Sequence, residues 1–418
     1  MALSTAAPAP ADIVLSQLTY RTGPYASGGI PLSDGFADYV TLLNERDGGI
    51  NGQRISIVEC EYGYDTQRGV ECYEETLAKG ALYYQPNSTG LTLALIERAH
   101  EDGVVLHTTG YGLTAASDGE TYPWIFNFPA HYWDAASAQI RYLKEKSGGS
   151  LQGKTVMHLH HNSGYGREPI QTLELLAERE GFDLLLQPID HPGEDQSALW
   201  PEIAEINPDY ILLWGWGVMN PTAYKGARSI DYPMERMVGV WWSAAEEDLK
   251  RLGKDAHGYK AVTFHDVGTA YAVYNEMNDL VYFAGKARGQ MNNIGTVLYN
   301  RGVVNAIYAT EAVRKAMEIH NTTDITRAML RDGFEALEID AERYTALGMD
   351  GFTPPIQVSC QDHGGGGQVA IKQWDAGRRV WDIITEYYQP DDDLIEPQIT
   401  QVAASFAADK AIEPQSCR

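Results

Sequence analysis

One short segment carries the groups that an anion would need. Asn87-Ser88-Thr89-Gly90 opens a predicted helix that runs to His100. The first N–H groups of a helix have no acceptor within it, and the helix dipole adds partial positive charge at that end. The hydroxyls of Ser88 and Thr89 stand beside those N–H groups, so the segment suits a carboxylate. The same hydroxyls could instead only cap the helix, which needs no ligand.

A second glycine-rich loop follows the predicted strand Val104–His107. Its sequence is Thr108-Thr109-Gly110-Tyr111-Gly112, and its glycines match the start of a dinucleotide-binding fingerprint. The residues that follow do not make the helix which that fingerprint requires. We therefore expect Thr109, Gly110 and Tyr111 to contact a ligand, with the tyrosine as a stacking ring. The alternative is an ordinary turn with an exposed tyrosine.

Four of the nine tryptophans fall in two segments that end predicted strands. These segments are Leu213-Trp214-Gly215-Trp216-Gly217 and Val240-Trp241-Trp242-Ser243. Aromatic rings at the ends of these strands indicate an aromatic or apolar ligand, because ring stacking is worth roughly 0.5–1.5 kcal/mol beyond burial. We expect Trp216, Trp241 and Trp242 to contact it. The alternative is that these rings pack behind the site.

Strands and helices alternate along the chain, which positions these loops. A strand over Ile13–Leu18, a helix, a strand over Ile55–Val58 and a helix over Thr66–Leu77 are typical of a parallel sheet with crossover helices. The pattern runs twice, with a break near residues 127–132. The sequence thus predicts an α/β fold of two doubly wound, Rossmann-like lobes with a ligand cleft between them, at the carboxyl ends of the strands.

We divide the chain accordingly. We expect residues 1–11 to form a flexible tail or the remnant of a signal peptide, because they are small, Pro-rich and uncharged. The remaining assignments are 12–130 plus 266–350 for the N-lobe, 131–265 plus 351–389 for the C-lobe, and 390–418 for a tail tied down by a disulfide.

The charge balance excludes several classes of protein. The 418 residues include 32 basic and 57 acidic side chains, a formal charge of −25. Nucleic-acid binding needs a basic footprint, and an anionic membrane surface would repel this chain. No apolar run is long enough to span a bilayer. The common hydrolase, zinc-protease and phosphate-loop motifs are missing, so we expect neither an enzyme nor a metal or cofactor site.

Four cysteines allow three disulfide connectivities. We favour Cys60–Cys72, which closes a short loop, and Cys360–Cys417, which holds the tail. The short loop alone would contribute on the order of 3 kcal/mol. Disulfides imply an oxidising compartment. Four free cysteines in a cytosolic protein are the alternative.

Three stretches together resemble a known family. The first is Tyr20-Arg-Thr-Gly-Pro-Tyr25, followed by a helix that ends in Leu43-Asn-Glu-Arg-Asp-Gly-Gly-Ile-Asn-Gly52. The second is the strand Ile55–Glu61, which runs into Tyr64-Asp65. The third is Pro86–Gly90 with the helix that it opens, followed by Leu106–Gly110. From about residue 12 to 385 the chain is similar to the solute-binding proteins of branched-chain amino-acid and amide ABC importers.

This resemblance implies two lobes joined by three crossings, which close on a ligand and then dock on a membrane permease. It adds Tyr25, Tyr165 and Arg301 to the expected ligand contacts. Tyr165 matches a family segment whose tyrosine meets the ligand, and Arg301 could pair with a carboxylate or form only a salt bridge. The spacing of Cys60 and Cys72 also resembles a bridge in the family's N-lobe.

One departure from the family bears on the ligand. Amino-acid-binding relatives place an acid where this chain places Trp241 or Trp242, and Glu246 and Glu247 come slightly later. A buried ammonium without a counter-charge is very costly. We therefore expect an aromatic carboxylate. Branched-chain amino acids or amides, a quaternary ammonium in an aromatic cage, and a ligand-sensing receptor domain are the alternatives.

The expected partners follow from this reading. They are a small-molecule ligand and the permease and ATPase subunits of an ABC importer, with no nucleic acid and no membrane insertion. We expect the protein to act in the periplasm as a monomer.

Overall fold

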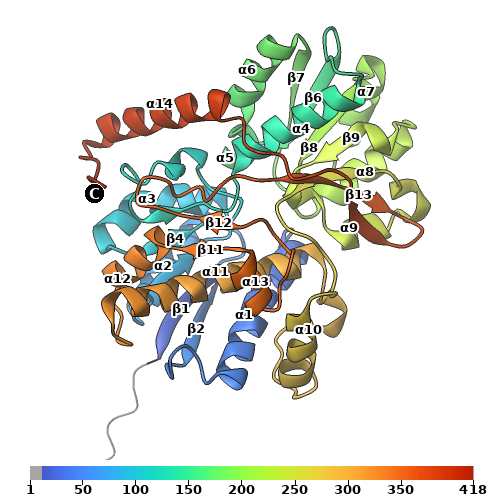
Figure 1. Cartoon of the computed structure of the whole chain (residues 1–418). Helices are drawn as coiled ribbons and strands as arrows, with labels where there is room; N and C mark the ends of the chain where they lie inside the picture. Colours follow the sequence, from blue (N-terminus) through green and yellow to red (C-terminus); the bar gives the residue numbers. More distant parts are fainter. Residues whose placement is uncertain (1–11, 418) are drawn as a thin grey trace, which may run out of the picture.

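Two α/β lobes lie side by side in the computed structural model, which describes residues 12–417 (Figure 1). The predicted tail or signal remnant, residues 1–11, lies outside the described residues. No helix within 12–417 is both long and apolar enough to cross a membrane.

The N-lobe is built on a parallel five-stranded sheet in the order β2-β1-β3-β4-β5. Strand β1, which lies inside the sheet between β2 and β3, is buried along almost its whole length. This is expected of a parallel strand with helices on both faces. Its elements are β1 (Ile13–Thr19), α1 (Ala26–Arg46), β2 (Ile55–Glu61), α2 (Thr66–Leu77), β3 (Tyr83–Gln85), α3 (Thr89–Asp102), β4 (Val105–His107) and β5 (Ile125–Phe126).

The C-lobe holds a seven-stranded sheet in the order β14-β13-β10-β9-β8-β6-β7. Five strands are parallel, and β13 and β14 add an antiparallel edge. Its strands are β6 (Thr155–His161), β7 (Asp183–Ile189), β8 (Tyr210–Trp214), β9 (Met237–Gly239), β10 (Lys260–Thr263), β13 (Ala370–Asp375) and β14 (Val380–Ile383). Its helices are α4 (Tyr132–Lys146), α5 (Gly164–Arg167), α6 (Ile170–Glu180), α7 (Leu199–Ile206), α8 (Met219–Ser229) and α9 (Glu246–Lys250).

The chain crosses between the lobes after β5, after β10 and before β13. Between the last two crossings, α11 (Val297–His320) packs along α1 of the N-lobe. The short strands β11 (Glu338–Ile339) and β12 (Ile356–Gln357) pair with each other. Residues 351–358 therefore lie with the N-lobe, beyond the boundary predicted at residue 351. The other helices of this segment are α10 (Ala272–Met277), α12 (Arg327–Glu335) and α13 (Ala341–Ala346).

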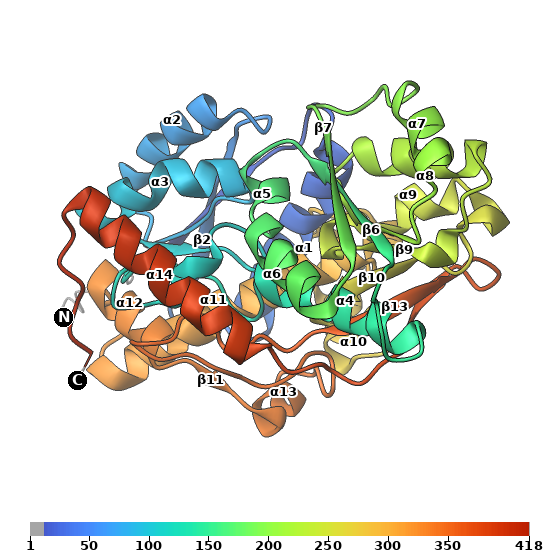
Figure 2. The same cartoon turned by 90° about the horizontal axis from the view of Figure 1, so that it is seen from above.

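The C-terminal segment forms a helix, α14 (Asp392–Lys410), that spans both lobes (Figure 2). At its start, the Arg179 guanidinium on α6 pairs with Asp391. At its end, the Phe406 ring stacks on Tyr122 of the N-lobe with centroids 4.8 Å apart. The predicted disulfide Cys360–Cys417 anchors the chain beyond it, and Cys60–Cys72 links β2 to α2.

Buried histidines in β6 make the fold sensitive to acid. His158 is fully buried, its Nε2 donates to the Gly166 carbonyl at 2.8 Å, and its ring stacks on His160 at 4.6 Å. Burial first, and then the neighbouring His160, lower the pKa of His158 to about 3. The folded protein thus keeps His158 neutral at pH values where the unfolded chain, with a pKa near 6.5, is protonated.

We predict that the neutral, buried His158 contributes fully to the free energy of unfolding above about pH 6.5. This contribution is lost as the pH falls toward 3. Denaturant unfolding of the wild type and of His158→Gln at pH 7 and pH 4.5 checks this. The wild type should lose roughly 2 kcal/mol more than the variant over this interval. His100→Gln, at an exposed position, is the control and should keep the wild-type dependence. An equal loss of unfolding free energy in the wild type and in His158→Gln would contradict the prediction.

Candidate functional site

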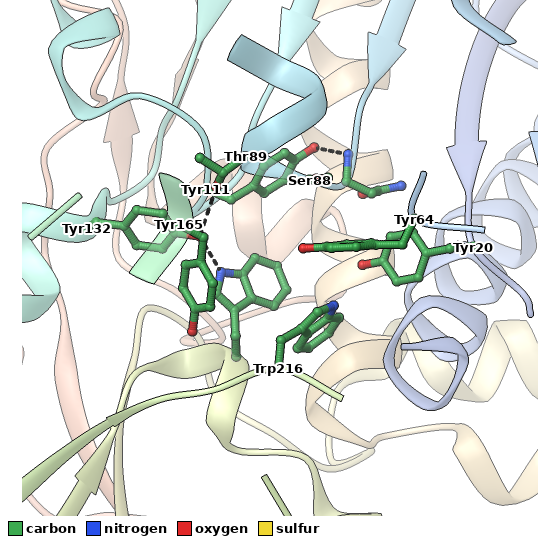
Figure 3. Close-up of a pocket in the computed structure, with 10 residues that line it drawn as sticks. Tyr20, Tyr64, Ser88, Thr89, Tyr111, Tyr132, Tyr165 and Trp216 are labelled. Carbon is green, nitrogen blue, oxygen red and sulfur yellow. Dashed lines mark hydrogen bonds between the residues drawn. The ribbon is translucent and has the colours of Figure 1, made fainter. Parts of the chain in front are cut away.

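A small cavity lies between the lobes (Figure 3). It is bordered by loops at the carboxyl ends of parallel strands from both sheets, where ligands of such folds bind. Its lining consists of Tyr20, Tyr64, Asn87, Ser88, Thr89, Tyr111, Tyr132, Tyr165, Trp216 and Trp242.

The start of α3 forms the polar wall of the cavity. Asn87 adopts a left-handed backbone with φ of 57°, and its N–H donates to the Tyr111 hydroxyl at 2.8 Å. The Ser88 hydroxyl accepts from the Leu91 N–H at 3.4 Å, so Ser88 caps the helix while also facing the cavity. Ser88 thus both caps α3 and lines the cavity. Thr89 accepts from the Gly112 N–H at 3.2 Å, which holds the two loops together.

Tyrosine rings from the N-lobe form a second wall. The Tyr20 and Tyr64 rings meet edge to face with centroids 4.8 Å apart, and the Tyr64 hydroxyl points toward the centre of the cavity (Figure 3). Burial raises the pKa of Tyr64 to about 12 and that of Tyr20 still further. Both side chains are therefore neutral phenols at neutral pH, able to donate a hydrogen bond to a ligand.

The C-lobe closes the cavity with two indoles and two phenols. The Trp216 and Trp242 rings meet edge to face at 5.2 Å. The Trp242 indole N–H donates both to the Gly110 carbonyl, at 3.0 Å, and to the Tyr132 hydroxyl, at 3.1 Å. The Tyr165 hydroxyl donates away from the cavity, to the Gly215 carbonyl at 3.1 Å. Tyr165 thus presents a ring rather than a hydroxyl.

Trp241 and Gly110, both predicted ligand contacts, do not line the cavity and instead hold the lobes together. The Trp241 indole N–H donates to the Gly110 carbonyl at 2.7 Å. Gly110 has φ of 71°, and a Cβ there would lie 2.8 Å from the Phe264 ring. Only glycine fits this close approach at this backbone conformation.

Tyr25 and Thr109 are also buried outside the lining. The Tyr25 hydroxyl lies 2.8 Å from His161 Nε2 and also contacts His191 Nδ1, so it links the N-lobe to two C-lobe histidines. The Thr109 hydroxyl lies 3.1 Å from His107 Nε2. The structure assigns both side chains to packing around the cavity.

Arg301 lies behind the cavity wall rather than in it. Its guanidinium is fully buried between the rings of Trp242, at 4.7 Å, and Phe264, at 4.3 Å. Its Nε bonds to His265 Nε2 at 3.1 Å, while Nη1 and Nη2 have no partner within the described chain. Burial lowers the pKa of Arg301 to about 9, so it stays charged at neutral pH.

Four lining residues were not among the predicted contacts: Tyr20, Tyr64, Asn87 and Tyr132. The first three stand inside the very motifs that carried the family resemblance, so those motifs were a usable signal. Tyr132 sits at the start of α4, just after a crossing between the lobes. Its place in the cavity depends on how the lobes face each other, which no local pattern reports.

The lining contains no ionisable acid or base other than tyrosine. The carboxylate of Glu246 accepts from the Val297 N–H at 3.0 and 3.1 Å and so caps α11. It is therefore not the counter-charge of a ligand ammonium. No group of three or more His, Cys, Asp or Glu within residues 12–417 could hold a metal ion.

Comparisons with known proteins agree with this architecture. A profile of the family described as "periplasmic binding protein" matches residues 13–379. A structure described as an ABC transporter permease from the Pseudomonas fluorescens group is 36% identical, covers 97% of this chain and 99% of its own, and has a TM-score of 0.88. No curated protein matches the chain.

Two more distant structures share the fold. A branched-chain amino-acid ABC transporter from Thermus thermophilus with bound valine is 18% identical over 93% of this chain and 98% of its own, with a TM-score of 0.77. A solute-binding protein from R. palustris in complex with benzoate is 16% identical over 91% and 97%, with a TM-score of 0.70.

The contacts of Tyr25 lead to a prediction about the lobes. Tyr25→Phe removes its hydroxyl contacts with both C-lobe histidines, each worth about 1 kcal/mol net. Together they amount to about 2 kcal/mol, so the ratio of open to closed molecules should rise roughly thirty-fold. Small-angle X-ray scattering of the ligand-free protein should show a larger radius of gyration.

Tyr73→Phe is the matched control, because the Tyr73 hydroxyl donates to Asp102 within the N-lobe at 2.8 Å. It should scatter like the wild type. Identical scattering by all three proteins would show that the Tyr25 contacts do not hold the lobes closed.

Proposed function

The chain belongs to the periplasmic binding protein family, and on that premise we propose that it captures an aromatic carboxylate between its lobes. It then delivers this ligand, chemically unchanged, to the permease and ATPase subunits of an ABC importer. Its two disulfides support a site of action in an oxidising, extracytoplasmic compartment.

The observation that carries the proposal is a cavity lined by seven aromatic rings and no carboxylate. An α-amino acid would bring a buried ammonium into this lining without a counter-charge, which costs several kcal/mol. The N-terminus of α3 carries partial positive charge and suits a carboxylate. The same charge disfavours a quaternary ammonium, although aromatic rings alone would accept one.

The fold has a precedent for an aromatic carboxylate as its ligand. The R. palustris relative, which holds benzoate, shows that the fold can carry such a ligand.

In the proposed mechanism, the carboxylate binds first at the start of α3, through the Ser88 and Thr89 region. The C-lobe then closes over the ring with Tyr165, Trp216 and Trp242. The indole bonds to the Gly110 carbonyl form on closure and lock the two lobes together. This is the hinge-type closure typical of two-lobed binding proteins.

Two pairs of compounds test the proposal, because each pair differs in one charged group. 3-Phenylpropionate and phenylalanine differ only by the ammonium, and benzoate and benzamide differ chiefly by the negative charge. We predict that the acids raise the melting temperature. An acid at 100 times its Kd should stabilise the protein by about 2.7 kcal/mol. Phenylalanine should bind at least about 100-fold more weakly than 3-phenylpropionate.

The panel also contains leucine and phenyltrimethylammonium. Stabilisation by leucine or phenylalanine would overturn the proposal and favour an amino-acid binder. Stabilisation by phenyltrimethylammonium alone would favour an aromatic cage for cations. Isothermal titration calorimetry of the compounds that shift the melting temperature then gives their Kd values.

A further inference from the structure

Arg301 is a buried cation without a counter-charge. It is 0% exposed, forms no ion pair within the described chain, and leaves both terminal nitrogens without a hydrogen-bond partner. Among residues 12–417, its only side-chain hydrogen-bond partner is His265. Burial, and then the charge of Arg301, hold the pKa of His265 well below its usual range. His265 is thus neutral and gives no charge compensation.

The nearby carboxylates are committed to other groups. Glu246 caps the N-terminus of α11 and also faces Lys372. Burial lowers the pKa of Lys372 to about 7, and the charge of Glu246 acts against this effect. Asp266 accepts from the Val267 N–H at 2.8 Å and from the Tyr271 hydroxyl. These two carboxylates therefore leave Arg301 uncompensated.

The positive charge of Arg301 lies where the two lobes meet. Arg301 belongs to α11, which packs along α1 of the N-lobe. Trp242 comes from the C-lobe and has one face on the guanidinium while the residue itself lines the cavity. The positive charge therefore stands one indole ring away from a bound ligand, in a region of low dielectric where charges interact strongly.

We propose that Arg301 is a positioning residue that makes lobe closure depend on a negatively charged ligand. This inference rests on the proposed function. Closing Trp242 over the guanidinium removes it from water, which is unfavourable while no anion is present. A carboxylate in the cavity supplies the missing counter-charge, so closure is favoured with an acid and disfavoured with a neutral or cationic ligand.

Arg301→Met tests this inference, because methionine fills similar space without the charge. We expect the ratio of the benzamide Kd to the benzoate Kd, measured by calorimetry, to fall roughly ten-fold in the variant. The ligand-free variant should also scatter as a more closed molecule. Its melting temperature should not fall, because a buried uncompensated charge has been removed.

Arg141→Met is the matched control. Its guanidinium also lies over an aromatic ring, that of Tyr388 at 4.3 Å, but Arg141 is an exposed residue outside the cavity. It should keep the wild-type ratio of Kd values. Arg301→Lys keeps the positive charge and should retain a preference for the acid, which separates the charge from the shape of arginine.

The outcomes are distinguishable. An unchanged benzamide-to-benzoate ratio in Arg301→Met, in a protein whose wild type prefers benzoate, overturns the role of Arg301 and leaves the proposed function standing. If Arg301→Met does not fold, loss of the acid preference in Arg301→Lys overturns the inference. If the wild type binds neither benzoate nor any other acid of the panel, both the proposed function and this inference fail.

Discussion

Two indole N–H groups share one carbonyl oxygen, and the closed site depends on this contact. Trp241 and Trp242 from the C-lobe both donate to Gly110 of the N-lobe. The contact fixes Trp242 as a wall of the cavity and brings Tyr132 into it through the second bond of the same indole. It also requires glycine at residue 110, because any side chain would strike Phe264. Trp242 therefore both lines the cavity and holds the lobes together.

The fold could be predicted from the sequence because its signals are local. Alternating apolar strands and amphipathic helices indicate a parallel sheet, and the parallel strands of both sheets match that prediction. The antiparallel edge of β13 and β14 was not predicted. Both disulfides match the separate prediction made from the cysteines. The residue at which the chain crosses back to the C-lobe was harder to predict. Strand β12 is only two residues long and is held by pairing with β11. So short a strand carries no periodicity of its own.

The site could be predicted only in part, since loops can be found from sequence but the direction of each side chain cannot. Ser88, Thr89, Tyr111, Tyr165, Trp216 and Trp242 come from the predicted loops and line the cavity. In the adjacent pair Trp241 and Trp242, one ring faces the cavity and the other packs against Phe264 at 5.1 Å. Which of two neighbouring indoles meets a ligand is decided by packing between the lobes.

Charge is distributed very differently outside and inside this protein. The net charge is −25, yet the positively charged Arg301 lies fully buried behind the cavity. The exposed negative charges are screened by water and salt over about 10 Å, whereas buried charges are screened far less. In the proposed mechanism, a ligand carboxylate that leaves bulk solvent exchanges a weak repulsion for a strong local attraction to Arg301. Because that attraction would develop only as Trp242 closes over Arg301, lobe closure would respond to the sign of the ligand's charge.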